Sequence, residues 1–273
     1  MKVHVEANRL KKNQLVIIIT LFLLLYYPIF PLLIHQWFND SKYSHGFLIP
    51  FIAGYLLWQR RSELMKVSLL PTNWGAVILI SGLFFYILGH IGGELFTMRF
   101  SMLVVIAGLI IYLTGYKMFK LVLFPLLFLI FMIPLPAVLF NSLTFPLQLL
   151  AAKTSMRFIY FLGIPVLREG NIIHLANTSL EVAEACSGLR SLNSFLALTA
   201  TYAALFYKSR IRQWVLFISA VPVAIFVNIV RVTVTAIGVQ LWGEQVAQGL
   251  LHESVGLVVF GMALGILLLI ARK

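Results

Sequence analysis

Residues 212–238 read Arg-Gln-Trp-Val-Leu-Phe-Ile-Ser-Ala-Val-Pro-Val-Ala-Ile-Phe-Val-Asn-Ile-Val-Arg-Val-Thr-Val-Thr-Ala-Ile-Gly, and this stretch decides the fold class. It is almost wholly apolar and longer than the roughly 20 residues that a helix needs to cross a bilayer. The basic residues Lys208, Arg210 and Arg212 lie at its start, as is typical of a cytoplasmic loop beside a membrane span. Arg231 lies near its far end. The stretch therefore predicts a transmembrane helix that carries a guanidinium to the opposite membrane boundary.

The rest of the chain has the same apolar character. Of its 273 residues, 61% are hydrophobic and 11% are charged, whereas soluble domains have about 45–50% apolar and about 25% charged residues. We therefore expect an all-α polytopic membrane protein, a single integral membrane domain over residues 1–273. The second expected span, near 44–59, is short. The fifth, near 118–138, is expected to be bent or ended by Pro125, Pro134 and Pro136. About eight transmembrane helices are expected, near residues 14–36, 44–59, 73–91, 99–116, 118–138, 186–207, 212–238 and 254–271.

The net charge of +12 is distributed unevenly along the chain. Fourteen of the 21 basic residues lie in five short clusters with only two acidic residues, and the other seven are matched by seven acidic residues. Because the whole excess lies on alternate loops, the positive-inside rule places these loops and both termini in the cytoplasm. We therefore expect a multi-pass protein of the cytoplasmic (inner) membrane, and no nucleic-acid partner. The clusters are Lys2/Arg9/Lys11/Lys12, Arg60/Arg61/Lys66, Lys117/Lys120, Lys208/Arg210/Arg212 and Arg272/Lys273.

Residues 139–185 form a long segment that is expected outside the membrane. Its first part, through Phe161, has the pattern of an amphipathic helix that lies on the membrane surface. Glu169, Gly170 and Asn171 predict a turn between two β-like runs, and a third run over 180–183 leads toward a cysteine. We therefore expect an extracytoplasmic amphipathic helix and a small β-like cap. On the helix, Leu147, Leu150, Phe158 and Phe161 are expected to face lipid, and Lys153 and Arg157 to face water.

Three polar side chains are predicted at the same depth in the membrane. Counting from the basic cytoplasmic end of the same helix, Cys186 is separated by 22 residues, Arg231 by 19 and His252 by 20. A helix rises about 1.5 Å per residue, so each separation corresponds to about 28–33 Å, close to one hydrocarbon thickness. A thiol, a guanidinium and an imidazole are therefore expected together at the outer boundary, facing the outside or periplasm.

Cys186 is the only cysteine of the chain. A lone cysteine in a membrane helix is usually a small buried hydrophobe, but its neighbours here favour chemistry. The run Glu-Ala-Cys-Ser-Gly-Leu-Arg over 184–190 places the thiol in the first turn of a helix, where the free N–H groups and the helix dipole favour a thiolate. Ser187 and Gly188 keep the approach to the sulfur open, while the carboxylate of Glu184 acts against the thiolate.

Arg231 interrupts an apolar run, and an ionisable residue at such a position is a candidate functional group. The alternative is an interfacial arginine that extends to the lipid headgroups. Asn228 lies one turn earlier on the same helix face and could orient the guanidinium. Arg190, one turn after Cys186, is the rival cation.

His252 is followed by Glu253, which raises the zinc-binding pattern H-E-x-x-H, but the second ligand position is Gly256 and the pattern fails. An interfacial histidine is the simpler interpretation of His252 alone. Beside a thiol and a guanidinium at its own depth, it becomes a candidate general acid and base. His45, at or just below the outer surface, is the rival base or a substrate-positioning group.

Two other classes of protein stay open at this point. A transporter or lipid flippase would account for many spans and an intramembrane arginine, but it would not need polar groups gathered at one membrane face. A metal-binding membrane protein could use Cys186, His45, His90 and His252, but no ligand spacing supports one. We expect neither a metal nor a cofactor.

Several motifs resemble those of the exosortase/archaeosortase family. Leu-Glu-Val-Ala-Glu-Ala-Cys-Ser-Gly-Leu-Arg-Ser-Leu (180–192), Asn-Ile-Val-Arg-Val (228–232) and His252 resemble its Cys, Arg and His motifs. Tyr-Ser-His-Gly-Phe-Leu-Ile-Pro (43–50) is similar to its amino-terminal signature, as is Gly-Ile-Pro-Val with Glu-Gly-Asn ahead of the cysteine. The likeness extends from about residue 37 to residue 262.

The resemblance implies a membrane-embedded cysteine protease or transpeptidase. Its substrates would be exported proteins that end in a sorting signal: a short motif of the Pro-Glu-Pro (PEP-CTERM) type, a transmembrane helix and a basic tail. By position, Cys186 would be the nucleophile, Arg231 the stabilising cation and His252 the acid and base. Membrane lipids and a lipid-linked acceptor are further expected partners. The exact sorting motif, the acceptor and the oligomeric state stay open.

Overall fold

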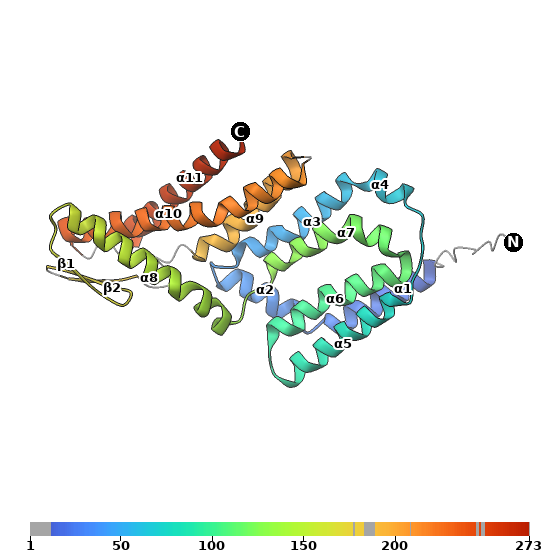
Figure 1. Cartoon of the computed structure of the whole chain (residues 1–273). Helices are drawn as coiled ribbons and strands as arrows, with labels where there is room; N and C mark the ends of the chain where they lie inside the picture. The colour runs from blue at the N-terminus through green and yellow to red at the C-terminus, as the bar shows by residue number, and fades with distance from the viewer. Residues whose placement is uncertain are drawn as a thin grey trace. The chain divides into compact units, whose positions relative to one another are not determined.

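The structure is a computed structural model that describes residues 12–176, 178–182, 189–207, 209–243, 246 and 249–272. Side chains at 12, 189–191 and 249–253 lie outside this description. The chain consists of two compact units, Met1–Pro136 and Ala137–Lys273 (Figure 1). The single integral domain expected from the sequence stays a prediction.

In the described part of the first unit, all regular structure is helical. The helices are connected by short turns. They are α1 Lys12–Tyr26, α2 Ile29–Asn39, the 3₁₀ helix η1 Ser44–Phe47, α3 Leu48–Gln59, α4 Arg61–Lys66, α5 Trp74–Ile91, α6 Leu95–Thr114, α7 Tyr116–Phe128 and the 3₁₀ helix η2 Leu129–Met132.

The first apolar run, expected as one span over 14–36, is divided into two helices. α1 ends at Tyr26, α2 begins at Ile29, and the two differ in direction by 59°. Pro28 lies between them. It lacks the N–H that a continuous helix needs, and its ring disfavours the helical conformation of the preceding residue. The apolar pattern thus located the segment correctly but did not reveal its break.

The second and fifth expected spans are short helices. α3 has 12 residues and α7 has 13, fewer than the roughly 20 that cross a bilayer. Pro125 lies inside α7, whereas Pro134 and Pro136 lie in the non-helical stretch that follows η2. The helix therefore ends before the last two prolines, as predicted.

α5 and α6 pack against each other along a seam of glycines. A Cβ atom added at Gly82 would lie 2.7 Å from Cγ2 of Val105 and 2.9 Å from its backbone N. Gly75 and Gly89, seven residues to either side, make similarly close approaches to α6. Residues seven apart lie on one helix face, so the absence of side chains along this face brings the two backbones together.

Within each unit, loops that are expected in the cytoplasm lie next to each other. In the first unit, Nη1 of Arg60 donates a hydrogen bond to the carbonyl of Leu121 at 3.2 Å. In the second, the hydroxyl of Tyr207 donates to the carbonyl of Ala271, which precedes Arg272. Among the described residues, Arg60 therefore lies beside the turn of α7 that carries Lys120, and the residue before Arg272 lies beside the end of α9. The cytoplasmic location of these basic clusters stays a prediction.

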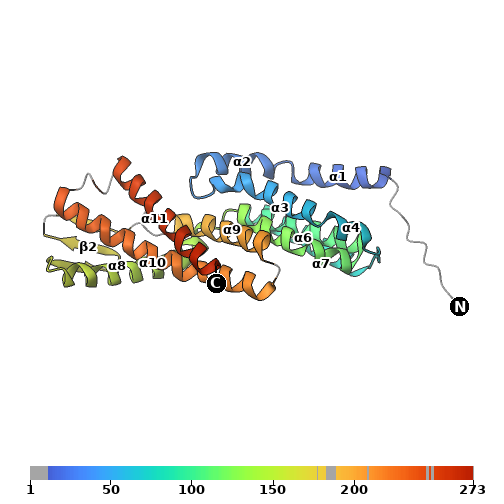
Figure 2. The ribbon, with the colours of Figure 1, turned by 90° about the horizontal axis from the view of Figure 1, so that it is seen from above.

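The second unit combines helices with one small sheet (Figure 2). Its central helix is α10, which contacts each of the other helices of the unit. Its elements are α8 Ala137–Phe161, β1 Val166–Glu169, β2 Ile172–Leu175, β3 Ser179–Glu181, α9 Leu189–Phe206, α10 Arg210–Trp242 and α11 Gly249–Ala271.

The three strands form an antiparallel sheet in the order β1-β2-β3. β1 and β2 pair with Glu169 opposite Ile172, so Gly170 and Asn171 form a two-residue turn. Gly170 has a φ of 61°, and glycine at the first central position suits a type II′ hairpin turn. The predicted turn and β runs are confirmed, while the position of the sheet outside the membrane stays a prediction.

α8 is the helix that was expected to lie on the membrane surface. Its buried face consists mostly of small or polar side chains, including Thr144, Gln148 and Ser155. This face packs against α10 and the sheet, and both views show the ribbon of α8 beside these elements (Figures 1 and 2). Lys153 and Arg157 are exposed, as are several large apolar side chains, namely Leu150, Phe158 and Phe161. The helix is confirmed, and its location at the membrane surface stays a prediction.

Four helices are long and apolar enough to cross a membrane, namely α5, α6, α10 and residues 254–271 of α11. The number rises to six if each of two bent helix pairs counts as one span. Both counts refer to the described residues. The chain is therefore a multi-pass, predominantly helical membrane protein, and the expected number of eight spans stays a prediction.

Candidate active site

Arg231 lies where α10 changes its packing partners. Before it, Val223 and Val227 belong to a buried cluster with side chains of α9 and α11. After it, Val232 and Ala236 belong to a second cluster with α8 and the sheet. The side chain of Arg231 therefore leaves the helix between two apolar cores. It is half-buried as a whole, and its Nε atom is fully buried.

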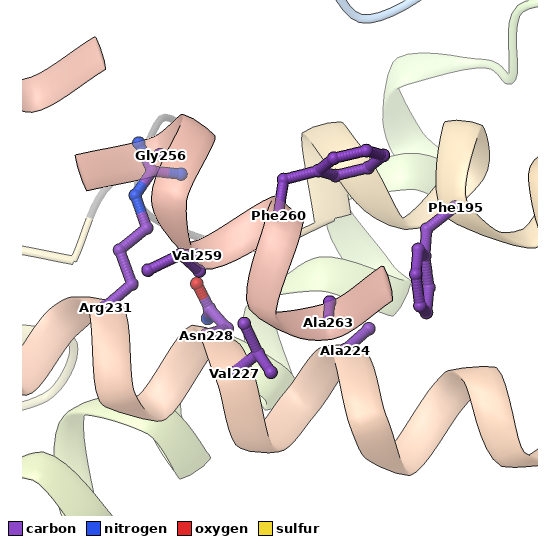
Figure 3. A pocket seen from close by; sticks show the side chains of 9 residues that line it. All are labelled: Phe195, Ala224, Val227, Asn228, Arg231, Gly256, Val259, Phe260 and Ala263. Atoms are coloured by element: carbon purple, nitrogen blue, oxygen red, sulfur yellow. The ribbon is translucent and has the colours of Figure 1, made fainter. Parts of the chain in front are cut away.

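A small cavity of about 30 Å³ lies beside Arg231, between α9, α10 and α11. Asn228, one turn earlier on α10, is 7% exposed and lines the cavity with Arg231, as the sequence pattern predicted for the same helix face. The remaining walls are formed by glycine and apolar side chains (Figure 3), namely Phe195, Ala224, Val227, Gly256, Val259, Phe260 and Ala263. Such walls lower the local dielectric, so the charge of the guanidinium acts more strongly there than in water.

The guanidinium of Arg231 extends from α10 to the first turns of α11 (Figure 3). A Cβ atom added at Gly256 would lie 3.2 Å from Nη2 of Arg231 and 3.4 Å from Cζ. Gly256 is four residues, about one helical turn, after His252 in the same helix. The structure thus brings Arg231 to the turn of α11 that follows His252, while the depth of both residues in the membrane stays a prediction.

Two hydroxyl groups, one from α8 and one from α10 itself, bond to the backbone of α10 just before Arg231. The carbonyl of Ile229 accepts a hydrogen bond from Ser155 of α8 at 3.2 Å and another from Thr233 at 2.8 Å. A threonine that bonds back to the preceding turn often bends a helix slightly. These contacts position the turn that carries the guanidinium.

Several predicted site residues lie outside the described residues. These include the proposed nucleophile Cys186 with Glu184, Ser187 and Gly188. β3 ends at Glu181, and the backbone N–H of Val182 donates to the carbonyl of Asn171 at 2.9 Å. The described part of α9 begins at Leu189. The chain around the cysteine therefore connects the last strand with α9.

Arg190 and His252 are described only as part of their helices. Arg190 belongs to the first turn of α9, and His252 to the first turn of α11. Their side chains lie outside the described residues. The rivalry between Arg190 and Arg231 for the role of the cation therefore stays a matter for experiment.

His45 belongs to the first unit, in the 3₁₀ helix η1. Its Nε2 lies 3.2 Å from the carbonyl of Phe131, and the ring is half-buried. The adjacent Gly46 makes room for the indole of Trp37, whose Nε1 donates to the carbonyl of Met132 at 2.9 Å. These bonds hold the loop of His45 against the end of η2.

Arg99 is a buried cation that sequence analysis missed. It lies near the start of α6, is 2% exposed, and donates from Nη1 to Oε1 of Gln36 in α2 at 2.8 Å. Glu94 caps α6 by accepting from the backbone N–H groups of Phe96 and Thr97 at 3.0 and 2.6 Å. Burial acts to raise the pKa of the Glu94 carboxyl, but these bonds and the charge of Arg99 outweigh it, so this pKa lies below its ordinary value.

A signal for Arg99 was present in the sequence, because it is a charged residue in an otherwise apolar segment. Its partner Gln36 is 63 residues away in the chain, so the pairing could not be inferred from local spacing. This polar group belongs to the first unit, as His45 does.

Comparison with known proteins identifies one family. The family model described as transmembrane exosortase (Exosortase_EpsH) matches residues 37–269. The match covers most of the chain and includes the positions of Cys186, Arg231 and His252. No curated protein and no solved structure matched the chain.

Proposed function

The chain belongs to the transmembrane exosortase family, and from this premise we propose that it is a cysteine peptidase or transpeptidase. It would cleave the C-terminal sorting signals of exported proteins at the outer face of the cytoplasmic membrane. The signal expected from the resemblance is a motif of the Pro-Glu-Pro type, a transmembrane helix and a basic tail.

One observation of the structure carries this proposal. Arg231 places its guanidinium beside Gly256, one turn after His252. A cation and a titratable imidazole on adjacent helices are suited to stabilise an anion and to transfer a proton. The nucleophile is assigned from the sequence, since Cys186 is the only thiol of the chain and lies within the matched region.

The proposed reaction begins when the thiolate sulfur of Cys186 attacks the carbonyl carbon of the scissile peptide. The electron pair of the C=O bond moves onto the oxygen, and Arg231 donates hydrogen bonds to this oxyanion or to the thiolate. When the tetrahedral intermediate collapses, the C–N bond breaks and protonated His252 supplies the proton to the leaving amine. The product is a thioester between Cys186 and the amino-terminal part of the substrate.

In the second half of the reaction, an acceptor attacks the thioester carbonyl. The neutral imidazole of His252 accepts the proton of the acceptor, and the thiolate of Cys186 leaves. Water as the acceptor gives hydrolysis, whereas an amine or a lipid-linked nucleophile gives transfer. The transmembrane helix of the substrate would place the cleaved bond at the membrane boundary, where the three groups are predicted to lie.

The proposal is tested with a substrate that carries such a sorting signal, co-expressed in cells with the wild-type protein, Cys186→Ala or Cys186→Ser. Wild type should release the C-terminal signal, whereas both variants should accumulate the uncleaved substrate. Neutral hydroxylamine, which cleaves thioesters, should release an acyl product from wild type alone. Equal amounts of enzyme in the membrane are the control. Normal processing by Cys186→Ala would remove the cysteine mechanism and leave the transporter class as the alternative.

A further inference from the structure

Gly256 lies in the second turn of α11, directly under the guanidinium of Arg231. Three atoms of the guanidinium occupy the space that a side chain would take: Nη2, Cζ and Nη1 would lie 3.2, 3.4 and 3.8 Å from an added Cβ atom. Figure 3 shows the side chain of Arg231 extending from α10 to this point of α11. A methyl group at 256 would therefore displace the guanidinium by a few tenths of an ångström.

Two other glycines of the same helix do not have such a neighbour. A Cβ atom added at Gly261 or Gly265 would find nothing within 4 Å among the described residues. Glycine weakens a helix relative to alanine, because it has more conformational freedom to lose on folding. At Gly256 the close approach of Arg231 gives a physical reason for glycine.

The surroundings of Gly256 restrict where the guanidinium can go if it is displaced. The cavity beside it is only about 30 Å³ and is bounded by Val259 and Phe260 of α11 and by Asn228 of α10. The Nε atom of Arg231 is already buried, and moving a charged group toward apolar walls is unfavourable. The position of the guanidinium is therefore set by the face of α11 that carries Gly256.

We propose that Gly256 is a positioning residue, whose missing side chain seats the guanidinium of Arg231 against α11, one turn from His252. This inference rests on the proposed function, since it assigns Gly256 a role in the same reaction. In the proposed mechanism, Gly256 contacts neither the substrate nor the reacting atoms. It acts through Arg231, by setting the distance between the cation and the developing oxyanion.

The consequence for catalysis follows from how strongly rates depend on geometry. A misplacement of about 1 Å can cost about 10²-fold in rate. For Gly256→Ala, which moves the guanidinium by less, we expect kcat to fall roughly tenfold with KM unchanged. For Gly256→Leu, which fills the space of the guanidinium, we expect a loss of about 10²-fold or more.

The test is a double-variant cycle on the full-length protein in detergent or membranes. Gly256→Ala and its matched control Gly261→Ala are each made in wild type and in Arg231→Ala. The thermal unfolding midpoint reports the packing contact independently of activity. In wild type, Gly256→Ala should lower the midpoint relative to Gly261→Ala, whereas in Arg231→Ala the two substitutions should shift it equally.

Cleavage rates measured on the same variants report the positioning role. Gly256→Ala should lower kcat only when Arg231 is present, so that it causes no further loss in Arg231→Ala. Equal effects of Gly256→Ala and Gly261→Ala on both midpoint and kcat in wild type would overturn the inference. If Arg231→Ala is inactive while Gly256→Ala and Gly256→Leu keep the wild-type kcat, the inference fails and the proposed function stands. Cleavage that does not depend on Arg231 would overturn the proposed catalytic role of Arg231, and this inference with it.

Discussion

The guanidinium of Arg231 is the proposed cation of the site, and both its chemistry and its surroundings suit that role. It keeps its charge at all ordinary pH values and offers a planar fork of donors. It reaches α11 at Gly256, while hydroxyl groups of Ser155 and Thr233 hold the backbone of the preceding turn. The proposed stabilisation of an oxyanion depends on the direction of these donors as much as on the charge.

Arg231→Lys should therefore retain little activity although it keeps the positive charge. Loss of one oxyanion donor typically costs about 10²–10³-fold in kcat, and we expect a loss of this size in a cleavage assay. Arg157→Lys, at an exposed position of α8, is the matched control and should cleave normally. If Arg231→Lys is benign while Arg190→Lys is crippling, the cation of the site is Arg190.

His252 and His45 lie in different units, and their variants should differ in turnover. His252 lies one turn before Gly256, whereas His45 bonds with the carbonyl of Phe131 in the first unit. Because proton transfer contributes about 10²–10⁴-fold to a rate, His252→Ala should lower kcat more than His45→Ala. The comparison is made at equal amounts of folded protein. A larger loss in His45→Ala would transfer the acid and base role to His45.

At the residue scale, the sequence revealed candidates by their chemical type but not by their contacts. Arg231 and Asn228 could be recognised because they are polar groups in an apolar run. Gly256 was informative only because it excludes a zinc motif, and its contact with Arg231 depends on which faces of α10 and α11 meet. The pairing of Arg99 with Gln36 could not be predicted for the same reason, since 63 residues separate them.

At the scale of elements, the packing of α5 on α6 depends on glycine at three positions along one face. At Gly82 the space for a Cβ atom is already taken by Val105 at 2.7 Å. By contrast, an added Cβ atom at Gly54 of α3 would meet nothing within 4 Å. Replacing Gly82 or Gly54 by alanine therefore separates two effects. Both changes raise helix propensity, but only the change at Gly82 disturbs the packing of two helices.

Gly82→Ala should lower the stability of the protein, whereas Gly54→Ala should leave it unchanged or raise it. Overpacking of a tight interface typically costs about 1–3 kcal/mol, while replacing glycine in a helix interior gains about 0.5–1 kcal/mol. The unfolding midpoint in detergent, measured for each variant against wild type, checks this. A stabilised Gly82→Ala would show that the two helices are not packed as closely as described.

Elements were predicted well where local chemistry determines them. The turn at Gly170 and the strands on each side of it follow from local residue preferences and were predicted. The break at Pro28 was not, because the apolar pattern continues across it from α1 to α2. Hydropathy measures the solvent that a segment prefers, and it does not register the loss of one backbone donor.

At the scale of the whole molecule, charge and hydropathy together predict a multi-pass membrane protein whose basic loops all lie on one side of the membrane. Among the described residues, Arg60 contacts Leu121, next to Lys120, and Tyr207 contacts Ala271, next to Arg272. Arg231 and Gly256 meet on α10 and α11, 19 residues after Arg212 and 16 before Arg272, respectively. At about 1.5 Å per residue, this places their contact well away from the basic end of the second unit.

The sequence could predict several membrane spans because the cost of burying charge in lipid acts on every span in the same way. The side of the membrane on which their ends lie stays a prediction. The sequence could not predict how many single helices are long enough to cross the membrane. The reason is that α3 and α7 are short and that α1 and α2 form a bent pair. Neighbouring helices must bury the ends of short and bent helices. Such contacts depend on the tertiary fold and not on local sequence.

The central claim is that Cys186 is an activated thiol at the outer face of the membrane, and labelling this single cysteine tests it most directly. A membrane-impermeant thiol reagent should label the protein in intact cells or spheroplasts and should not label it in inverted vesicles. Because an unperturbed thiol titrates near pH 8.5 and a helix start with a nearby guanidinium lowers that value, labelling should persist at mildly acidic pH. In Arg231→Ala it should shift to higher pH. Labelling from the cytoplasmic side alone would invert the topology and contradict the proposed site.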